Sequence, residues 1–329
     1  MPADSRFTTR AYRDGDETAI LDLFNRSFPH SPRSVAHWRW KYRDNPFGSG
    51  RISLTFDAGG RLVGHYSGYP VPFVRDGKSV LAHQIGDTMT EPSVRHIGRG
   101  PTSILGKTAL HFYEHFCENQ VAFNYGFNVA NIQKFSLRFL RSDRVEPVTW
   151  RVRAPLPPIA RFERWTRGYQ FEEVRETGAA FDDLFARAAG AYRFLVRRDA
   201  QYVRWRYLQC PDVPYVVVAI RKWRRLAGWI VFRVTQTRLI LGDLLIHPSF
   251  PDALEVALRH VVPSHPVETI ETWLPPRPQW VDLALRDLGF ETRPEPQDLS
   301  VMCVPFTWPE ATARMRESLF FTRGDSDLF

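Results

Sequence analysis

The sequence predicts a mixed α/β protein that contains two tandem copies of one fold. The first observation is a strand-like run at 80–90 that passes through a glycine turn into a helix-like run at 102–117. The second is an internal repeat, because short segments of the first half return in the same order in the second half. Turn signals at 57–61 and 76–78 add two hairpins of antiparallel strands ahead of the glycine turn.

Length and composition are those of a globular protein of about two domains. The chain has 329 residues, of which 43% are hydrophobic and 24% are charged. The formal net charge of +8 and the pI of about 9.6 favour anionic partners, such as a phosphorylated cofactor. The densest basic run, at 221–225, is typical of a hairpin turn, so nucleic acid is not the expected partner.

The remaining composition predicts a cytoplasmic protein without metal or membrane contacts. Three widely spaced cysteines indicate free thiols in a reducing compartment rather than disulfides or a metal site. The N-terminal segment lacks the apolar core of a signal peptide, and no apolar run approaches the roughly 18 residues that span a bilayer.

The repeat defines the predicted domain organisation. The repeated pairs are Asp22–Arg26 with Asp183–Arg187, Trp40–Tyr42 with Trp205–Tyr207, Arg61–Gly64 with Arg225–Gly228, Gly86–Asp87 with Gly242–Asp243, and Leu137–Leu140 with Leu285–Leu288. We therefore expect a first domain at 1–153, with 148–153 as its closing strand, and a second domain at 161–306. A proline-rich linker at 154–160 joins them, and a tail follows at 307–329.

The glycine turn after the 80–90 strand has the residues of a phosphate-binding loop. It reads Arg95-His96-Ile97-Gly98-Arg99-Gly100. Glycines let backbone N–H groups face a ligand, the helix start adds unpaired donors, and the arginines add positive charge. The dinucleotide motif would need glycine where Ser103 stands, and the nucleotide P-loop would need it at Pro101.

An ordinary strand-to-helix turn is the alternative interpretation of this stretch. The repeat helps to decide between the two. After Pro248-Ser249 the second copy continues with 250–253, which contains no arginine or glycine and includes Asp252. A purely structural turn would not need to differ so much between the copies, so we interpret 95–100 as a ligand loop.

The pattern R-x-x-G-x-G resembles the pyrophosphate loop of GNAT acyltransferases, [QR]-x-x-G-x-[GA]. The segment 124–131, Asn-Tyr-Gly-Phe-Asn-Val-Ala-Asn, resembles that family's junction of strand five and helix four. Over residues 6–305 the chain resembles a tandem GNAT protein whose second domain is degenerate. This resemblance implies, in each domain, a mixed, mostly antiparallel sheet flanked by helices.

The resemblance also implies an acyl-CoA co-substrate, with acetyl-CoA as the default donor and no metal. Backbone groups near Met89 and Thr90 would pair with the pantetheine arm, and Arg95 and the amides of 96–100 would hold the pyrophosphate. Asn128 or Asn131 would contact the arm from the other side. Capping of a helix start is the alternative role for these two asparagines.

In the family, an acceptor amine attacks the thioester directly, so a base and an acid are expected. His83 and Asp87 share one face of the 80–90 strand, where the family often has its base. Asp243 repeats Asp87 in the copy without a loop, which favours a structural role for both. The helix-four tyrosine that often serves as acid is absent from 135–139, which leaves Tyr125 or Tyr113 as a substitute.

Two further features concern the acceptor. Trp38 is a candidate acceptor contact, because the second copy has Val203 in its place. The tail carries Phe320, Phe321, Leu328 and Phe329 among polar residues, so we expect it to dock. By analogy with other tandem GNAT proteins, Asp325 and Asp327 could bind a cationic acceptor in the first domain; the alternative is that the tail only covers apolar surface.

The leading hypothesis from the sequence is an N-acyltransferase that transfers an acyl group from acyl-CoA to an amine acceptor in a ternary complex. Amino sugars, peptides, small amines and protein lysines all remain open as acceptors. Two alternatives are a tRNA-dependent aminoacyltransferase of the related tandem fold, and a non-catalytic acyl-CoA sensor or scaffold. The second of these stays open because the helix-four tyrosine is missing.

Overall fold

The structure, a computed structural model, describes residues 6–154 and 168–329 and divides into two compact units. The first unit comprises Met1–Pro72, Val80–Pro147 and Leu299–Arg316, and the second comprises Phe73–Ser79, Val148–Asp298 and Glu317–Phe329. The predicted linker at 154–160 lies, after residue 154, outside the described residues.

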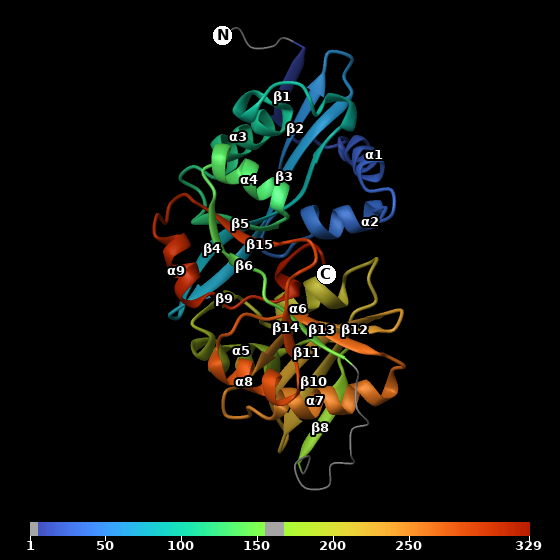
Figure 1. The fold of residues 1–329 in the computed structure, drawn as a ribbon, viewed down its shortest axis with the longest axis vertical. Helices are drawn as coiled ribbons and strands as arrows, with labels where there is room; N and C mark the ends of the chain where they lie inside the picture. The colour runs from blue at the N-terminus through green and yellow to red at the C-terminus, as the bar shows by residue number, and fades with distance from the viewer. Residues whose placement is uncertain (1–5, 155–167) are drawn as a thin grey trace. The chain divides into compact units, whose positions relative to one another are not determined.

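The first unit is a mixed sheet with helices, in the strand order β1-β2-β3-β4-β5-β15-β6 (Figure 1). Its strands are β1 (Phe7–Ala11), β2 (Arg51–Asp57), β3 (Leu62–Arg75), β4 (Lys78–Thr90), β5 (Phe123–Asn128), β6 (Asp143–Pro147) and β15 (Ser300–Pro305). Its helices are α1 (Glu17–Ser27), α2 (Val35–Trp38), α3 (Ile104–Phe116), α4 (Ala130–Phe139) and α9 (Ala311–Ser318), with a π-helical turn η1 (Arg39–Arg43) and 3₁₀ turns η2 (Pro92–Val94) and η3 (Gly100–Thr102). Only the β4–β5 pair is parallel among the pairings described for this sheet order.

The second unit has the same architecture, in the strand order β8-β10-β11-β12-β13-β7-β14. Its strands are β7 (Trp150–Arg153), β8 (Tyr169–Glu173), β9 (Phe194–Val196), β10 (Val216–Lys222), β11 (Arg225–Thr235), β12 (Arg238–Ile246), β13 (Thr269–Trp273) and β14 (Glu291–Arg293). Its helices are α5 (Ala179–Tyr192), α6 (Ala200–Val203), α7 (Ala253–Val261) and α8 (Gln279–Asp287), with turns η4 (Arg204–Leu208), η5 (Val262–Ser264) and η6 (Arg323–Asp325). Here β12 and β13 form the parallel pair.

The predicted repeat is therefore a repeat of structure. The correspondence extends to local detail in α2 and α6. The side chain of Ser34 accepts a hydrogen bond from the His37 amide at the start of α2, and Asp199 accepts one from Tyr202 at the start of α6. Both helices then continue into a π-helical turn that carries the repeated Trp-Lys-Tyr or Trp-Arg-Tyr segment. The prediction of two tandem, mixed α/β domains is confirmed.

The two sheets exchange strands, which the sequence analysis did not predict, and β9 also pairs antiparallel with β3 of the first sheet. The 148–153 segment was expected to close the first domain, but β7 pairs antiparallel with β13 and β14 in the second sheet. In return, β15 lies between β5 and β6 of the first sheet. Strand-forming sequence specifies a strand but not its sheet, because the partner is chosen by packing. The compact units therefore differ from the predicted boundaries at 153 and 306.

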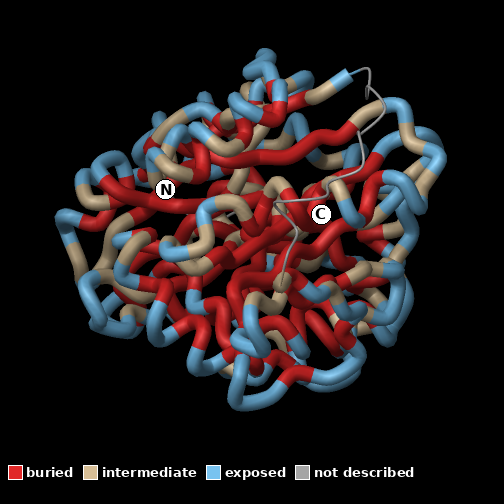
Figure 2. Tube along the Cα trace, turned by 90° about the horizontal axis from the view of Figure 1, so that it is seen from below, coloured by how far each residue is buried: buried red, intermediate tan, exposed pale blue. Residues whose placement is uncertain are grey.

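Each unit buries its own core, whose residues are red in Figure 2. In the first unit, Ala109, Phe112 and Tyr113 lie on one face of α3 and pack against Tyr66. Val304 of the exchanged strand β15 belongs to the same cluster. No helix in the described ranges is long and apolar enough to cross a membrane.

The exchange predicts that residues 1–153 cannot fold alone. This fragment lacks β15, whose Val301 and Cys303 are fully buried, and it would leave β5 as an unpaired sheet edge. We expect the fragment to be insoluble or aggregated, as measured by size-exclusion chromatography and circular dichroism after expression.

The matched control adds residues 299–316 through a flexible linker after Pro147, which restores the missing strand to the first sheet. We expect this version to be more soluble than the 1–153 fragment. A monomeric, cooperatively folded 1–153 fragment would contradict the importance of the exchanged strand.

Candidate functional site

The loop at 95–100 is exposed and is shaped by its glycines. Gly98 has a φ of +73° and Gly100 a φ of +53°, a backbone region that favours glycine. A Cβ atom on Gly98 would lie 2.3 Å from the carbonyl oxygen of Thr102, and one on Gly100 would lie 2.7 Å from the Phe139 ring. A side chain at position 98 would therefore collide with the backbone, and one at position 100 would have to displace the Phe139 ring.

Backbone donors of this loop remain available to a ligand. Among the described residues, the amides of His96 and Gly98 have no hydrogen-bond partner, whereas the Ile97 amide donates to the Val94 carbonyl at 3.0 Å. Ser103 caps the following helix α3, since its side chain accepts from the Gly106 amide at 3.1 Å. An exposed turn with open amides, two arginines and a helix start fits a pyrophosphate group.

The end of β4 leads directly into this loop. Met89 is buried, whereas Thr90 is partly exposed. The Arg95 side chain folds back, and its Nε donates to the Thr90 carbonyl at 3.0 Å. Arg95 therefore braces the junction of strand and loop, and the exposed side chain of Arg99 is the second cation of the loop.

Strands β4 and β5 pair over a short stretch only. Their parallel ladder joins 82–84 to 123–125, although β4 continues to Thr90 and β5 to Asn128. Backbone groups at the carboxyl ends of the two strands are therefore not used by the β4–β5 ladder. This is where the GNAT resemblance expects an acyl-CoA arm.

The two candidate asparagines have different surroundings, and neither caps helix α4. The helix N-cap is Val129, without a side-chain cap. Asn128 donates through Nδ2 to the Ser136 hydroxyl at 3.3 Å and accepts from Gln133 through its backbone oxygen at 2.7 Å. Asn131 is exposed in the first turn of α4, so the capping alternative is wrong for both residues.

Asp87 is the centre of a buried polar cluster in the first unit. Its Oδ2 accepts hydrogen bonds from Arg33 Nη1 at 2.9 Å, Lys41 Nζ at 2.8 Å and the Tyr42 hydroxyl at 2.6 Å. Burial opposes its ionisation, but the charges of Arg33 and Lys41 and these hydrogen bonds outweigh burial and lower the pKa of Asp87 far below its ordinary value. Its φ of +50° marks an irregular position in β4.

The pKa values of two neighbours of Asp87, Tyr42 and His65, are also shifted. Burial, and then the Asp87 charge, raise the pKa of Tyr42 well above its ordinary value, so its hydroxyl stays protonated. His65 donates from Nδ1 to the Asp87 carbonyl at 2.7 Å, and burial lowers the pKa of this imidazole to about 4. The cluster therefore holds an ionised carboxylate between protonated donors at neutral pH.

A narrow recess opens beside this cluster. It has room for no more than about one water molecule, and its lining residues all belong to the first unit: Ile20, Leu21, Phe24, Arg33, His37, Trp38, Tyr42, Asp87 and Met89. Trp38 is in the wall of this recess. Its indole Nε1 is buried without a hydrogen-bond partner in the described part of the chain.

His83 and Tyr125 lie in the core rather than in the recess. His83 is 2% exposed, and its Nδ1 is 3.8 Å from the Cys117 sulfur. Burial lowers the pKa of His83 to about 4. Tyr125 is buried between the rings of Phe123 and Phe127. These surroundings favour packing roles for both residues over the roles of acid and base.

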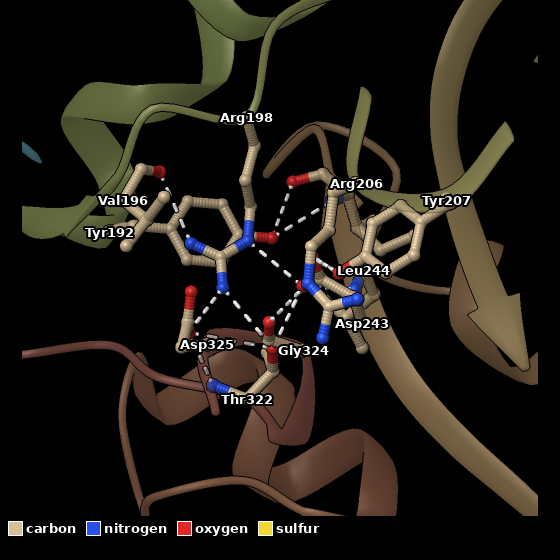
Figure 3. A network of polar contacts seen from close by, with 11 residues as sticks. Tyr192, Val196, Arg198, Arg206, Tyr207, Asp243, Leu244, Thr322, Gly324 and Asp325 are labelled. Atoms are coloured by element: carbon tan, nitrogen blue, oxygen red, sulfur yellow. Dashed lines mark hydrogen bonds and ion pairs between the residues drawn. The ribbon is translucent and has the colours of Figure 1, made fainter. Parts of the chain in front are cut away.

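The tail residue Asp325 has a structural place in the second unit, where the sequence analysis expected a contact with an acceptor in the first (Figure 3). Arg198 is fully buried, and its Nη2 contacts Asp325 Oδ2 at 2.6 Å while its Nε contacts Asp243 Oδ1 at 2.9 Å. Thr322 donates its amide to Asp325 at 2.7 Å. Asp327 is partly exposed beyond this network.

The position of Asp243 confirms its correspondence with Asp87. Each accepts from the tyrosine of its π-helical turn, Tyr207 or Tyr42, and each contacts an arginine. The structural interpretation of Asp87 is thereby supported. What the sequence analysis missed is Arg33, although Arg198 repeats it at the same offset that relates Trp205 to Trp40.

In the described ranges, no group of three or more His, Cys, Asp or Glu side chains is placed to hold a metal ion.

Comparisons with known proteins agree with this arrangement. Residues 8–136 match the family model of the acetyltransferase (GNAT) domain. No curated protein matches the sequence. Solved structures that share the fold include a GCN5-related N-acetyltransferase from Anabaena variabilis, with a TM-score of 0.67 and 13% identity, over 91% of this chain and 72% of that one.

Two further solved structures extend the comparison of the fold. Eis1 from Mycobacterium abscessus has a TM-score of 0.58 and 18% identity, over 93% of this chain and 74% of its own. Saccharomyces cerevisiae N-myristoyltransferase with bound myristoyl-CoA has a TM-score of 0.58 and 12% identity, over 93% of this chain and 80% of that one. At these identities the likeness establishes the fold alone.

The second-unit network predicts a pH-dependent stability. Burial and the nearby charge of Asp243 raise the pKa of Asp325 from 3.8 to about 6, because together they outweigh the charge of Arg198, which lowers this pKa. The folded state then binds more protons than the unfolded state between these values, so the free energy of unfolding falls as pH rises from about 4 to 6. Urea unfolding of the parent and of Asp325→Asn across this pH range measures the change in the free energy of unfolding.

We expect the difference in unfolding free energy between the parent and Asp325→Asn to change between pH 4 and pH 6 and to level off above. Asp327→Asn is the matched control, because Asp327 is partly exposed. If the difference in unfolding free energy between the parent and Asp325→Asn stays constant with pH, the raised pKa of Asp325 is refuted.

Proposed function

We propose that this chain is an N-acyltransferase that uses acyl-CoA, with acetyl-CoA as the default donor, because residues 8–136 match the GNAT acetyltransferase domain and the chain has a tandem GNAT-like fold. The observation that carries the proposal is the exposed loop at 95–100. It has open amides, two glycines at positive φ, and two arginines, and it precedes a helix. The second unit has no such loop, so one acyl-CoA is expected per chain.

In this proposal the amides of His96 and Gly98 and the start of α3 bind the pyrophosphate, and Arg99 adds charge. Backbone groups at Met89 and Thr90 face the pantetheine arm, and Asn128 or Asn131 lies on its other side. Acyl-CoA supplies the thioester that the acceptor amine attacks. The acceptor nitrogen is proposed to approach the small recess beside Asp87, which has Trp38 in its wall.

Direct attack requires a neutral amine. His83, with a pKa of about 4, and Asp87, with a pKa far below its ordinary value, are both weak bases, so neither is suited to take the proton of an ammonium group. Asp87 instead suits electrostatic stabilisation of positive charge on the attacking nitrogen, because its carboxylate stays ionised at the recess.

The aminoacyltransferase alternative leaves the pyrophosphate loop without a role, and the sensor alternative leaves the recess without one. Turnover of acetyl-CoA with a panel of amines distinguishes a transferase from a sensor. The turnover is measured as release of the CoA thiol. Dependence on charged tRNA would favour the aminoacyltransferase.

The loop assignment predicts that Gly98→Asp strongly weakens CoA binding. The new side chain collides with Thr102 and adds negative charge beside the phosphates, so we expect CoA affinity to fall at least about 30-fold by calorimetry. Arg99→Glu, which changes only charge at an exposed position, should weaken binding less, by about tenfold.

Gly60→Asp is the matched control. Gly60 has a comparable φ of +78° in an exposed turn of the first unit, and a Cβ there meets nothing within 4 Å. It should retain the parental CoA affinity. The loop assignment fails if folded Gly98→Asp also retains that affinity.

The pH dependence of catalysis gives a second test. Because no proposed group titrates between pH 6 and pH 9, kcat/KM should rise with pH and level off near the pKa of the acceptor amine itself. Two acceptors of different amine pKa should therefore show different inflections. An inflection at one fixed pH for both would instead assign the rise to a group of the enzyme.

A further inference from the structure

The second unit contains an open groove of about 160 Å³ on one face of its sheet. The groove is lined by residues of β8, β10 and β11, by the C-terminal end of α7 and by the turn η5 that follows this helix. A protein cavity of about 150 Å³ binds benzene, so a groove of this volume accommodates a ligand about the size of one aromatic ring. Among the described residues that line the groove, none takes part in the proposed acyl transfer.

The corresponding surface of the first unit is covered by helix α3. The Phe112 ring of this helix lies against Gly68, where a Cβ atom would be 3.0 Å from the ring. His111 of the same helix has its Nδ1 at 2.8 Å from Ser53 Oγ, on the neighbouring strand. Side chains of α3 therefore pack directly on these sheet positions.

The second unit has a groove over the same positions because its helix is shorter. Strands β10 and β11 repeat the register of β2 and β3, since Val216 stands opposite Phe232 as Arg51 stands opposite Gly68. Helix α7 has 9 residues, compared with 13 in α3, and Pro263 follows shortly after its end. The groove is thus a feature in which the second copy departs from the first.

Apolar and aromatic side chains form the surface of the groove. Val218 and Phe232 are buried beneath it. Phe171 is stacked on His260, with ring centroids 4.2 Å apart, and Phe232 meets the ring of His265 edge-on at 5.4 Å. These rings suit the apolar body of a ligand, and a phenyl face also attracts a cation.

The groove is acidic, although the chain is basic. Its described lining residues include Glu172 and Glu173 but no lysine or arginine, whereas the chain has a formal net charge of +8. Arg221 approaches Glu172 at 3.6 Å, which is a weak contact because the Glu172 side chain is 66% exposed. Glu173 makes no ion pair within the described ranges. The C-terminal end of α7 adds partial negative charge, so the groove favours a cation.

From the volume, the aromatic rings and the charge we infer that this groove is a binding site for a small organic cation, an amine whose apolar body is about the size of one ring. Its ammonium group contacts Glu172 and Glu173, and its apolar body packs on Phe171 and Phe232. A metal ion suits the groove less, because the described residues include no group of three His, Cys, Asp or Glu side chains placed to hold one. The inference is independent of the proposed acyl transfer, because it concerns binding to the second unit.

The experiment measures binding to the full chain by calorimetry, at neutral pH and low ionic strength and without acetyl-CoA. The three probes are 2-phenylethylamine, 2-phenylethanol and 3-phenylpropanoate, which share a phenyl ring on a short chain and carry positive, zero and negative charge. We expect the amine to bind at least about tenfold more tightly than the alcohol, and the carboxylate to bind more weakly than the alcohol. Added salt should reduce the preference for the amine.

Two substitutions in the groove test its assignment. Glu173→Gln removes one carboxylate and keeps the size of the side chain, so it should weaken amine binding at least about threefold and leave alcohol binding within about twofold. Val216→Arg gives the groove the residue type that the first copy has at this position, Arg51, and so adds a cation. This change should weaken amine binding at least about tenfold.

Each substitution has a matched control. Val216→Met keeps an apolar side chain at a partly exposed position. Glu176→Gln removes the carboxylate of an exposed residue that is not among those lining the groove. Both controls should keep the parental amine affinity within about twofold. Circular dichroism establishes that each variant is folded.

The same substitutions locate the bound amine, because the proposed transferase site is in the first unit. If folded Glu173→Gln and Val216→Arg both keep the parental amine affinity, the amine binds elsewhere, and the inference fails while the transferase proposal is unaffected. Equal affinity for the amine and the alcohol, or no amine binding at millimolar concentration, also overturns it. Amine binding that both substitutions weaken supports the groove even when no acyl transfer is detected.

Discussion

A carboxylate buried in the fourth strand of each sheet requires strong partners, and this requirement organises both units. Removing a carboxylate from water is costly unless cations and hydrogen-bond donors surround it. Asp87 receives Arg33, Lys41 and Tyr42, and Asp243 receives Arg198 and Tyr207. The need for these donors ties the helix and π-helical turn before the second strand to the middle of the sheet.

The strand exchange places a second constraint on the fold. Each sheet is completed by a strand that is distant in sequence, β15 in the first and β7 in the second. Neither half of the chain therefore contains all the strands of one sheet. Formation of both sheets depends on contacts between residues far apart in sequence, which favours cooperative folding of the whole chain.

The two copies differ from each other at two corresponding places in the fold. After the fourth strand, the first copy has a glycine loop with open amides, whereas the second has Asp252 and no glycine. Beside the buried aspartate, the first copy has a recess lined by apolar residues, whereas the second receives Asp325. The same scaffold therefore has an exposed glycine loop in one copy and contacts with the tail of the chain in the other.

The sequence by itself determined the duplicated α/β fold, the loop at 95–100, and the equivalence of Asp87 with Asp243. These features depend on local patterns, namely hydrophobic periodicity, glycine spacing and repeated short segments, and such patterns are readable along the chain. Only the tertiary structure decided that His83 is a core residue, that Asp325 is paired with Arg198, and that β7 and β15 change sheets. Those outcomes depend on burial and on partners more than 100 residues away, such as Arg198 for Asp325, which no local pattern records.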